Sequence, residues 1–145
     1  QTGKPIYLST GMSTLDEIDT AVQILEIHAS SFVLFHCNSA YPAPSEDLNL
    51  KLIPFYKNRY GCLVGYSGHE QNIEPSVVAA SLGAEYIERH ITTDHNMWGT
   101  DQKASLEISA MDMLKRRIDD AILAMGNGIK TITPSEMGVI KKLRG

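Results

Sequence analysis

The sequence lacks any apolar run approaching the ~18 residues that a membrane-spanning helix requires. Acidic residues at positions 16, 17 and 19 argue against a secretory signal near its start. Cysteine is scarce, because Cys37 and Cys62 are the two cysteines and they are not spaced as Cys-x-x-Cys. A disulfide scaffold and a thiolate zinc site are therefore not expected. We predict a cytoplasmic protein with reduced thiols and no membrane partner.

Positive charge is not in excess either. The 145 residues include 13 Lys and Arg against 17 Asp and Glu, and the basic residues are scattered apart from a short run at 141–144. The resulting net charge of −4 predicts no nucleic-acid partner. No Gly-x-Gly-x-x-Gly follows a predicted strand, which argues against dinucleotide binding but leaves other open sheets as candidates.

Strand-like and helix-like segments alternate along the chain. The most apolar is residues 31–37, a nearly continuous run typical of a parallel strand buried on both faces. Thr14 and Glu17 form a capping box ahead of the first helix, and Pro54 predicts a kink or a late start in the second. Strands are predicted at residues 6–9, 31–37, 63–66 and 86–92, and helices from Thr14, over 48–60, over 76–82 before Gly83, and from a cap at Ser109 to Gly126.

Four strand-helix units in one α/β domain predict either a doubly wound sheet or half of an eightfold barrel. After the last unit we expect a tail with short ordered pieces. Polar residues gather after every predicted strand, at the end where both architectures place their active sites.

Two histidines stand out among these polar residues. His69 and His90 each lie at or near the end of a predicted strand, so adjacent parallel strands can bring two imidazoles together, and imidazole suits a divalent transition metal. Strand alternation puts Ser67 beside His69 and Glu88 beside His90 on common faces. The alternative is that both histidines are buried and bonded to the backbone.

Other strand ends carry hydroxyls and a carboxylate. Ser9 and Thr10 precede a helix start, where they favour either an anion site or a plain helix cap. Ser39 and Tyr41 offer hydroxyls at the next strand end or are ordinary turn residues. Asp101 lies in a loop with a tryptophan, an arrangement that suits a sugar, although a turn carboxylate is the alternative.

Six motifs stand along nearly the whole chain: Lys4-Pro5-x-x-x-Ser9-Thr10-Gly11-Met12, His36-Cys37-x-x-x-Tyr41-Pro42, Gly65-Tyr66-Ser67-Gly68-His69, Glu88-Arg89-His90-Ile91-Thr92, Gly99-Thr100-Asp101 and Ala104-Ser105-Leu106-Glu107. Together they resemble the sialic acid synthase family, in the family's order and spacing. The resemblance implies an α/β fold that is the second half of a TIM (β/α)8 barrel, with its last four strand-helix units in residues 1–145. The first four strands and the antifreeze-like C-terminal domain of the family are then absent.

The resemblance also implies a ligand set. It makes His69 and His90 the ligands of a divalent metal, Mn²⁺ or Mg²⁺, and it makes Ser9 and Ser67 binding residues for phosphoenolpyruvate. Ser39 stands where family members have asparagine, and it can still donate one hydrogen bond to the same substrate.

The implied activity is an N-acetylneuraminate synthase, which condenses phosphoenolpyruvate with N-acetylmannosamine or its 6-phosphate. Tyr41 and Asp101 match positions that touch the sugar, and strand alternation suggests that Glu88 orients a metal ligand. The family implies a homodimer, and we expect the 145-residue chain alone to be inactive. The alternatives are a synthase for another nonulosonic acid, such as legionaminic acid, and a non-catalytic metal- or sugar-phosphate-binding half-barrel.

Overall fold

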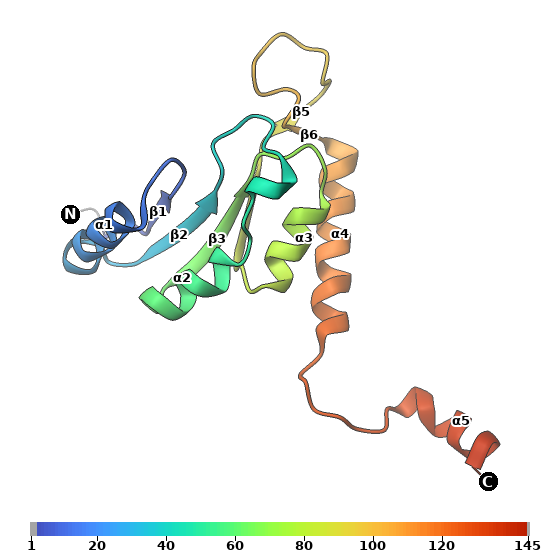
Figure 1. The fold of residues 1–145 in the computed structure, drawn as a ribbon. Coiled ribbons are helices and arrows are strands. Elements are labelled where there is room, and N and C mark those ends of the chain that lie inside the picture. The colour runs from blue at the N-terminus through green and yellow to red at the C-terminus, as the bar shows by residue number, and fades with distance from the viewer. Residues whose placement is uncertain (1–2, 145) are drawn as a thin grey trace.

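The computed structural model describes residues 3–144 and confirms the α/β fold (Figure 1). Its main sheet has four parallel strands in the order β1-β2-β3-β4, so each strand pairs with the next along the chain. The strands are β1 (Ile6–Ser9), β2 (Phe32–Cys37), β3 (Leu63–Gly68) and β4 (Tyr86–Arg89), with β5 (Ile91–Thr92) and β6 (Leu106–Glu107) forming a separate pair. The helices are α1 (Leu15–His28), the short η1 (Ser45–Asp47), α2 (Leu52–Tyr60), α3 (Glu74–Ser81), α4 (Ile108–Met125) and α5 (Pro134–Arg144).

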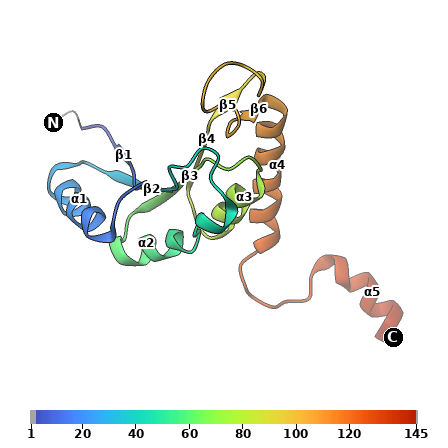
Figure 2. The same cartoon turned by 45° about the horizontal axis from the view of Figure 1, so that its top comes forward.

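The two faces of the main sheet have different surroundings. Helices α1, α2 and α3 line one face, where Leu34 and Val64 are fully buried in the main core (Figures 1 and 2). The side chains of Tyr7, Leu63 and Tyr86 belong to the opposite face by register and are 55%, 46% and 38% exposed. Burial of apolar area on the helix side therefore holds this sheet together.

Most helix boundaries follow their local signals. The Thr14 N–H donates to the Glu17 carboxylate over 2.7 Å, and Glu17 N–H donates back to the Thr14 hydroxyl over 3.4 Å, which confirms the capping box. Helix α2 starts late, at Leu52, and places Pro54 in its first turn, where a missing N–H costs little. It ends at Gly61, whose φ of 61° is left-handed and suits glycine.

Two predicted boundaries were wrong. The predicted strand over residues 86–92 is two strands, because the ladder with β3 ends at Arg89 and the chain then turns to pair with β6. Ser109 does not cap α4. The helix begins at Ile108, with Glu107 as its N-cap residue and no side-chain cap, since β6 leads directly into it.

The predicted tail contains a regular helix. The Thr133 N–H, just before α5, donates to the Glu136 carboxylate over 2.8 Å, and Pro134 occupies the first position of the helix. The sequence carried this start signal, which our prediction of short ordered pieces passed over. Helix α5 lies apart from the sheet, beyond an extended connection from α4 (Figure 1).

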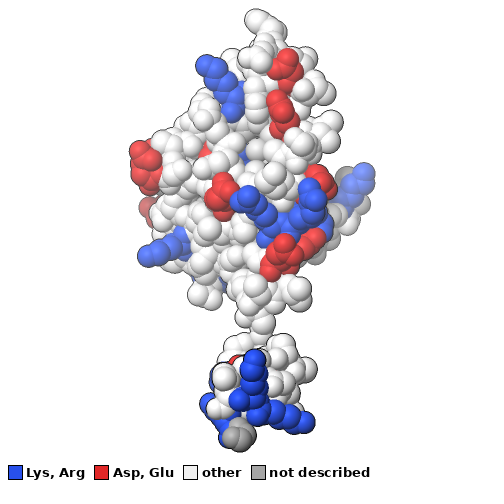
Figure 3. Space-filling model, turned by 90° about the vertical axis from the view of Figure 1, so that its right-hand side faces the viewer, with Lys and Arg blue, Asp and Glu red and all other residues white. Residues whose placement is uncertain are grey.

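The described part of the chain has no helix that is both long and apolar enough to span a membrane. On the side shown in Figure 3, basic and acidic side chains are interspersed over the body of the molecule. Basic side chains gather on α5, whose last turn includes Lys141, Lys142 and Arg144.

Candidate active site

The predicted histidines lie together at the carboxyl end of the sheet. The last paired residues of β3 and β4 are Gly68 and Arg89, so His69 and His90 are the first residues beyond the ladder on two neighbouring strands. Their rings lie edge to face with centroids 5.4 Å apart. The parallel sheet thus brings together two residues that are far apart in sequence.

His69 is buried and held from several sides. Its Nδ1 donates to the main-chain oxygen of Asn38 over 2.5 Å, because a carbonyl can only accept. In the neutral ring this leaves Nε2 with its lone pair, and Nε2 lies 3.1 Å from the Tyr41 hydroxyl and 3.2 Å from Ser67 Oγ. Both hydroxyls therefore converge on the nitrogen that a metal would use.

Tyr41 and Asp101 complete the cluster around the histidines. The Tyr41 ring stacks on His69 at 4.2 Å between centroids and lies 5.5 Å from His90. Asp101 Oδ2 lies 3.8 Å from His90 Nδ1, and its side chain is 51% exposed. Burial, followed by the charge of Asp101, raises the pKa of Tyr41, so its hydroxyl keeps its proton at neutral pH.

Glu88 contacts a serine rather than a histidine. Ser67 Oγ donates to Glu88 Oε1 over 2.8 Å, and the two residues are paired across β3 and β4. Strand alternation correctly predicted the shared face. Glu88 reaches His69 indirectly, through the Ser67 hydroxyl that both contact.

The residues present fit a divalent cation. A metal lies about 2 Å from an imidazole nitrogen, and two rings with centroids 5.4 Å apart are close enough to share one ion. The Asn38 carbonyl that fixes the His69 tautomer is a partner commonly found behind metal-bound histidines. Within residues 3–144 no group of three or more His, Cys, Asp or Glu is positioned around one ion.

The two remaining serines lie away from this cluster. Ser9 is exposed and shares the sheet face of Ser67, but β2 separates their strands, which puts them roughly 10 Å apart across the sheet. It does not cap α1, since Thr14 does. Ser39 lies over Gly11, where an added Cβ would come within 2.2 Å of Ser39 Oγ. The structure thus brings Ser67, but not Ser9, against His69.

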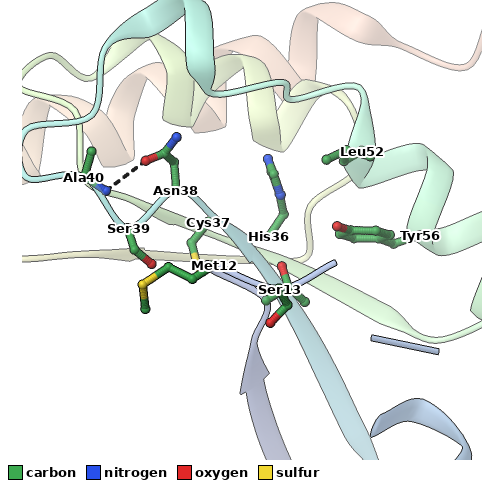
Figure 4. A pocket seen from close by; sticks show the side chains of 10 residues that line it. Met12, Ser13, His36, Cys37, Asn38, Ser39, Ala40, Leu52 and Tyr56 are labelled. Carbon is green, nitrogen blue, oxygen red and sulfur yellow. Dashed lines mark hydrogen bonds between the residues drawn. The ribbon is translucent and has the colours of Figure 1, made fainter. Parts of the chain in front are cut away.

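A cavity of about 390 Å³ opens beside Ser39, at the ends of β1 and β2 (Figure 4). Its lining includes Thr10, His36 and Tyr56, whereas neither His69 nor His90 lines it. His36 Nε2 donates to the Leu48 carbonyl over 2.6 Å, and burial lowers the pKa of its ring. His36 therefore lines the cavity with its Nε2 already bonded to the main chain.

Cys37 lines this cavity and is paired in register with Ser67. Burial of its thiol raises the pKa of Cys37. The expected inert, buried cysteine agrees with this environment.

Our sequence reasoning missed an ion pair next to the histidines. Glu70 and Arg89 are adjacent in sequence to His69 and His90, and their side chains are 2% and 0% exposed. Opposite charges flanking the two candidate ligands were a signal, but burial of those charges depends on packing that no local pattern reveals.

Known proteins that are similar to this chain in sequence include synthases. The NeuB family model matches residues 1–130. An N,N'-diacetyllegionaminic acid synthase from Campylobacter jejuni is 42% identical over 144 residues, covering 97% of this chain and 43% of that protein. An N-acetylneuraminate-9-phosphate synthase from Homo sapiens is 39% identical over 142 residues, covering 97% of this chain and 40% of that protein.

The fold also matches a crystal structure. An N-acetylneuraminic acid synthetase from Leptospira borgpetersenii, in complex with citrate, superimposes with a TM-score of 0.84 and 33% identity, over 99% of this chain and 50% of that one. The chain therefore spans half or less of the length of these relatives. Four parallel strand-helix units covering half of a longer synthase agree with the predicted half of a (β/α)8 barrel.

Proposed function

Because the chain belongs to the NeuB family of sialic and nonulosonic acid synthases, we propose that its protein condenses phosphoenolpyruvate with an N-acylmannosamine. The products are a nine-carbon sugar acid and phosphate. The observation that carries the proposal is the convergence of His69, His90, Tyr41 and Asp101 at the carboxyl end of one sheet. Enzymes with this architecture place their active sites at that end.

His69 and His90 are the proposed ligands of Mn²⁺ or Mg²⁺. When bound, the cation supplies Lewis-acid polarisation of the sugar aldehyde. The Asn38 carbonyl holds the His69 ring in the tautomer that presents Nε2, and the Tyr41 ring packs against its face. Both contacts prepare the ring before any ligand arrives, which reduces the cost of ordering it on binding.

The chain's hydroxyls are assigned to the phosphate. In the proposed reaction carbon 3 of phosphoenolpyruvate attacks the aldehyde, water adds at carbon 2, and the bond between carbon 2 and the bridging oxygen breaks. Ser9, Ser39 and Ser67 donate hydrogen bonds to the phosphate that leaves. Glu88 accepts from Ser67 and so holds its oxygen in place before the substrate binds.

Tyr41 and Asp101 are assigned to the sugar. Both are partly exposed beside the histidines, so each can bind a hydroxyl of an open-chain sugar while contacting His69 or His90. The similar relatives include synthases of legionaminic acid and of N-acetylneuraminate 9-phosphate. We favour N-acetylmannosamine or its 6-phosphate, and a panel of N-acylmannosamines with and without phosphate separates these substrates.

The decisive experiment follows the bridging oxygen of phosphoenolpyruvate. The full-length protein is incubated with N-acetylmannosamine, Mn²⁺ and phosphoenolpyruvate labelled with heavy oxygen at the bridge. We expect mass spectrometry to find the label in inorganic phosphate. Label retained in the sugar acid would mean attack at phosphorus and would refute the roles assigned to the serines and histidines. A parallel reaction without sugar controls for simple hydrolysis.

Residues 1–145 alone are expected to be inactive. The chain spans half or less of the length of its relatives, so strands and ligands that the rest of a barrel would supply are missing from it. The sheet face that includes Tyr7 and Tyr86 is also exposed, and soluble chains usually cover such a surface. Phosphate release by the purified 145-residue chain from phosphoenolpyruvate and N-acetylmannosamine would contradict this expectation.

A further inference from the structure

A buried ion pair lies directly behind the two histidines. Arg89 Nη1 is 3.0 Å from Glu70 Oε1, and solvent reaches almost none of either side chain. Glu70 follows His69 in sequence and Arg89 precedes His90. The pair therefore joins the two histidine-bearing segments through their immediate neighbours.

Main-chain pairing alone does not hold these segments together. The β3–β4 ladder ends at Gly68 and Arg89, so no strand register fixes His69 relative to His90. Beyond the ladder, hydrogen bonds of the Arg89 guanidinium connect the two segments. It donates to the Glu70 carbonyl and, over 2.9 Å, to the Asn72 carbonyl, binding the backbone that follows His69 to the end of β4.

The Glu70 carboxylate is held from its other sides as well. The Tyr66 hydroxyl donates to Oε2 over 2.8 Å, and Ser76 Oγ lies 3.3 Å from Oε1. Ser76 also accepts from Arg89 Nη1 over 3.0 Å. Groups from β3, from α3 and from the loop between them thus contact the pair, and these hydrogen bonds hold both side chains in place.

Stability alone is a weak reason for this arrangement. Removing two charges from water offsets much of their attraction, and apolar residues often replace such pairs without loss of stability. Within residues 3–144 the buried Nε of Arg89 has no hydrogen-bond partner, which adds a further cost. A network that is costly to bury but holds both side chains through several hydrogen bonds is better suited to positioning.

We propose that Glu70 and Arg89 are positioning residues that set the separation and relative orientation of the His69 and His90 rings. Through those rings they set the affinity of the site for a divalent cation. This inference rests on the proposed function, because it gives the two histidines a shared metal. It predicts that the ion pair affects metal binding more than it affects folding.

The test replaces the pair by apolar residues in the full-length protein. In the variant Glu70→Met/Arg89→Met we expect the thermal midpoint to stay near that of the wild type. Its affinity for Mn²⁺, measured from the electron paramagnetic resonance signal of free Mn²⁺, should fall about 10- to 100-fold, as for other residues that orient metal ligands. The kcat at saturating Mn²⁺ should fall as well.

A matched control lies at the other end of the same strands. Lys57 Nζ and Glu85 Oε1 form an ion pair at 2.5 Å, and Glu85 also accepts from the N–H of Val64 at the start of β3. The variant Lys57→Met/Glu85→Met removes this pair far from the histidines. We expect its Mn²⁺ affinity to match that of the wild type.

The outcomes separate the inference from the proposed function. Unchanged Mn²⁺ affinity in the Glu70→Met/Arg89→Met protein overturns the positioning role, whereas the metal site stands. If that variant does not fold, Glu70→Gln and Arg89→Lys decide by the same measurement, because each keeps its side-chain length and breaks the fork-to-carboxylate geometry. A wild-type protein that binds no Mn²⁺ overturns the proposed function and the inference together.

Discussion

Two halves of the same sheet edge hold their polar side chains differently. In the histidine half, formed by Ser67, His69, Glu88 and His90 at the ends of β3 and β4, side chains bond to one another across strands. In the serine half, formed by Ser9, Thr10, Cys37 and Ser39 at the ends of β1 and β2, the Thr10 hydroxyl donates to the main-chain oxygen of Phe35.

The difference indicates that side-chain positions are more strongly fixed by neighbouring side chains in the histidine half than in the serine half. Each side chain of the histidine half depends on several others, so one substitution disturbs its neighbours. In the serine half the Thr10 side chain bonds to the main chain, which stays in place when a side chain is substituted. We therefore expect substitutions in the histidine half to cost more activity than comparable ones in the serine half.

The largest effect should come from the metal ligands. Replacing His69 or His90 with alanine removes one of the two imidazoles, and we expect metal-dependent turnover to fall to background. Metal content after dialysis and phosphate release measure the effect. His95→Ala is the control, since that ring binds the Ser105 carbonyl outside the cluster. Near-normal activity in both ligand variants would show that the histidine half does not hold the metal.

A large but smaller effect is expected at Ser67. The variant Ser67→Ala leaves the Glu88 carboxylate and His69 Nε2 without their shared partner. If the hydroxyl stabilises the departing phosphate, kcat should fall by roughly 10²-fold, the effect typical of losing one such donor. Steady-state kinetics in phosphoenolpyruvate measures it. A rise in KM with unchanged kcat would assign Ser67 to ground-state binding instead.

The serine half should respond more mildly. Ser39→Ala removes one hydrogen-bond donor, worth about 1 kcal/mol, so KM for phosphoenolpyruvate should rise about fivefold. Gly11→Ala should act through the same side chain, because its Cβ would come within 2.2 Å of Ser39 Oγ. The double variant is then expected to lose no more than Gly11→Ala alone. Additive losses would mean that the two positions act independently.

The smallest effect concerns His36, which supports the serine half. Burial lowers the pKa of its ring below the ordinary 6.5, so the unfolded chain takes up a proton first as the pH falls. Stability is fully present above pH 6.5 and declines below it, by at most about 1.4 kcal/mol per pH unit. Urea midpoints at neutral pH and near pH 5.5 should differ less in His36→Gln than in the wild type.

Local patterns predicted much of this fold. The capping box at Thr14, the apolar run of β2 and the glycine after α2 depend on neighbours in sequence, and each element formed as expected. The break at His90 could not be predicted, because residues 91 and 92 favour a strand in either sheet. Their choice depends on β6, which lies more than ten residues further along the chain.

In the candidate site, too, some features were predictable from the sequence and others depended on the fold. The sequence alone predicted that His69 and His90 lie at or near the ends of two strands that a parallel sheet can place side by side, and β3 and β4 are paired in this way. Their contact with Tyr41 also depends on how the loop between β2 and η1 folds back over the sheet.

By itself, the sequence determined the alternation of strands and helices, the sheet edge where chemistry is possible, and the resemblance to a synthase family. These depend on residue type, period and spacing, which are local properties. Only the tertiary structure decided that Glu70 and Arg89 are buried together, and that Ser67 reaches His69 while Ser9 does not. Such contacts join residues through packing, and the energy of a contact depends on solvent exclusion by distant parts of the chain.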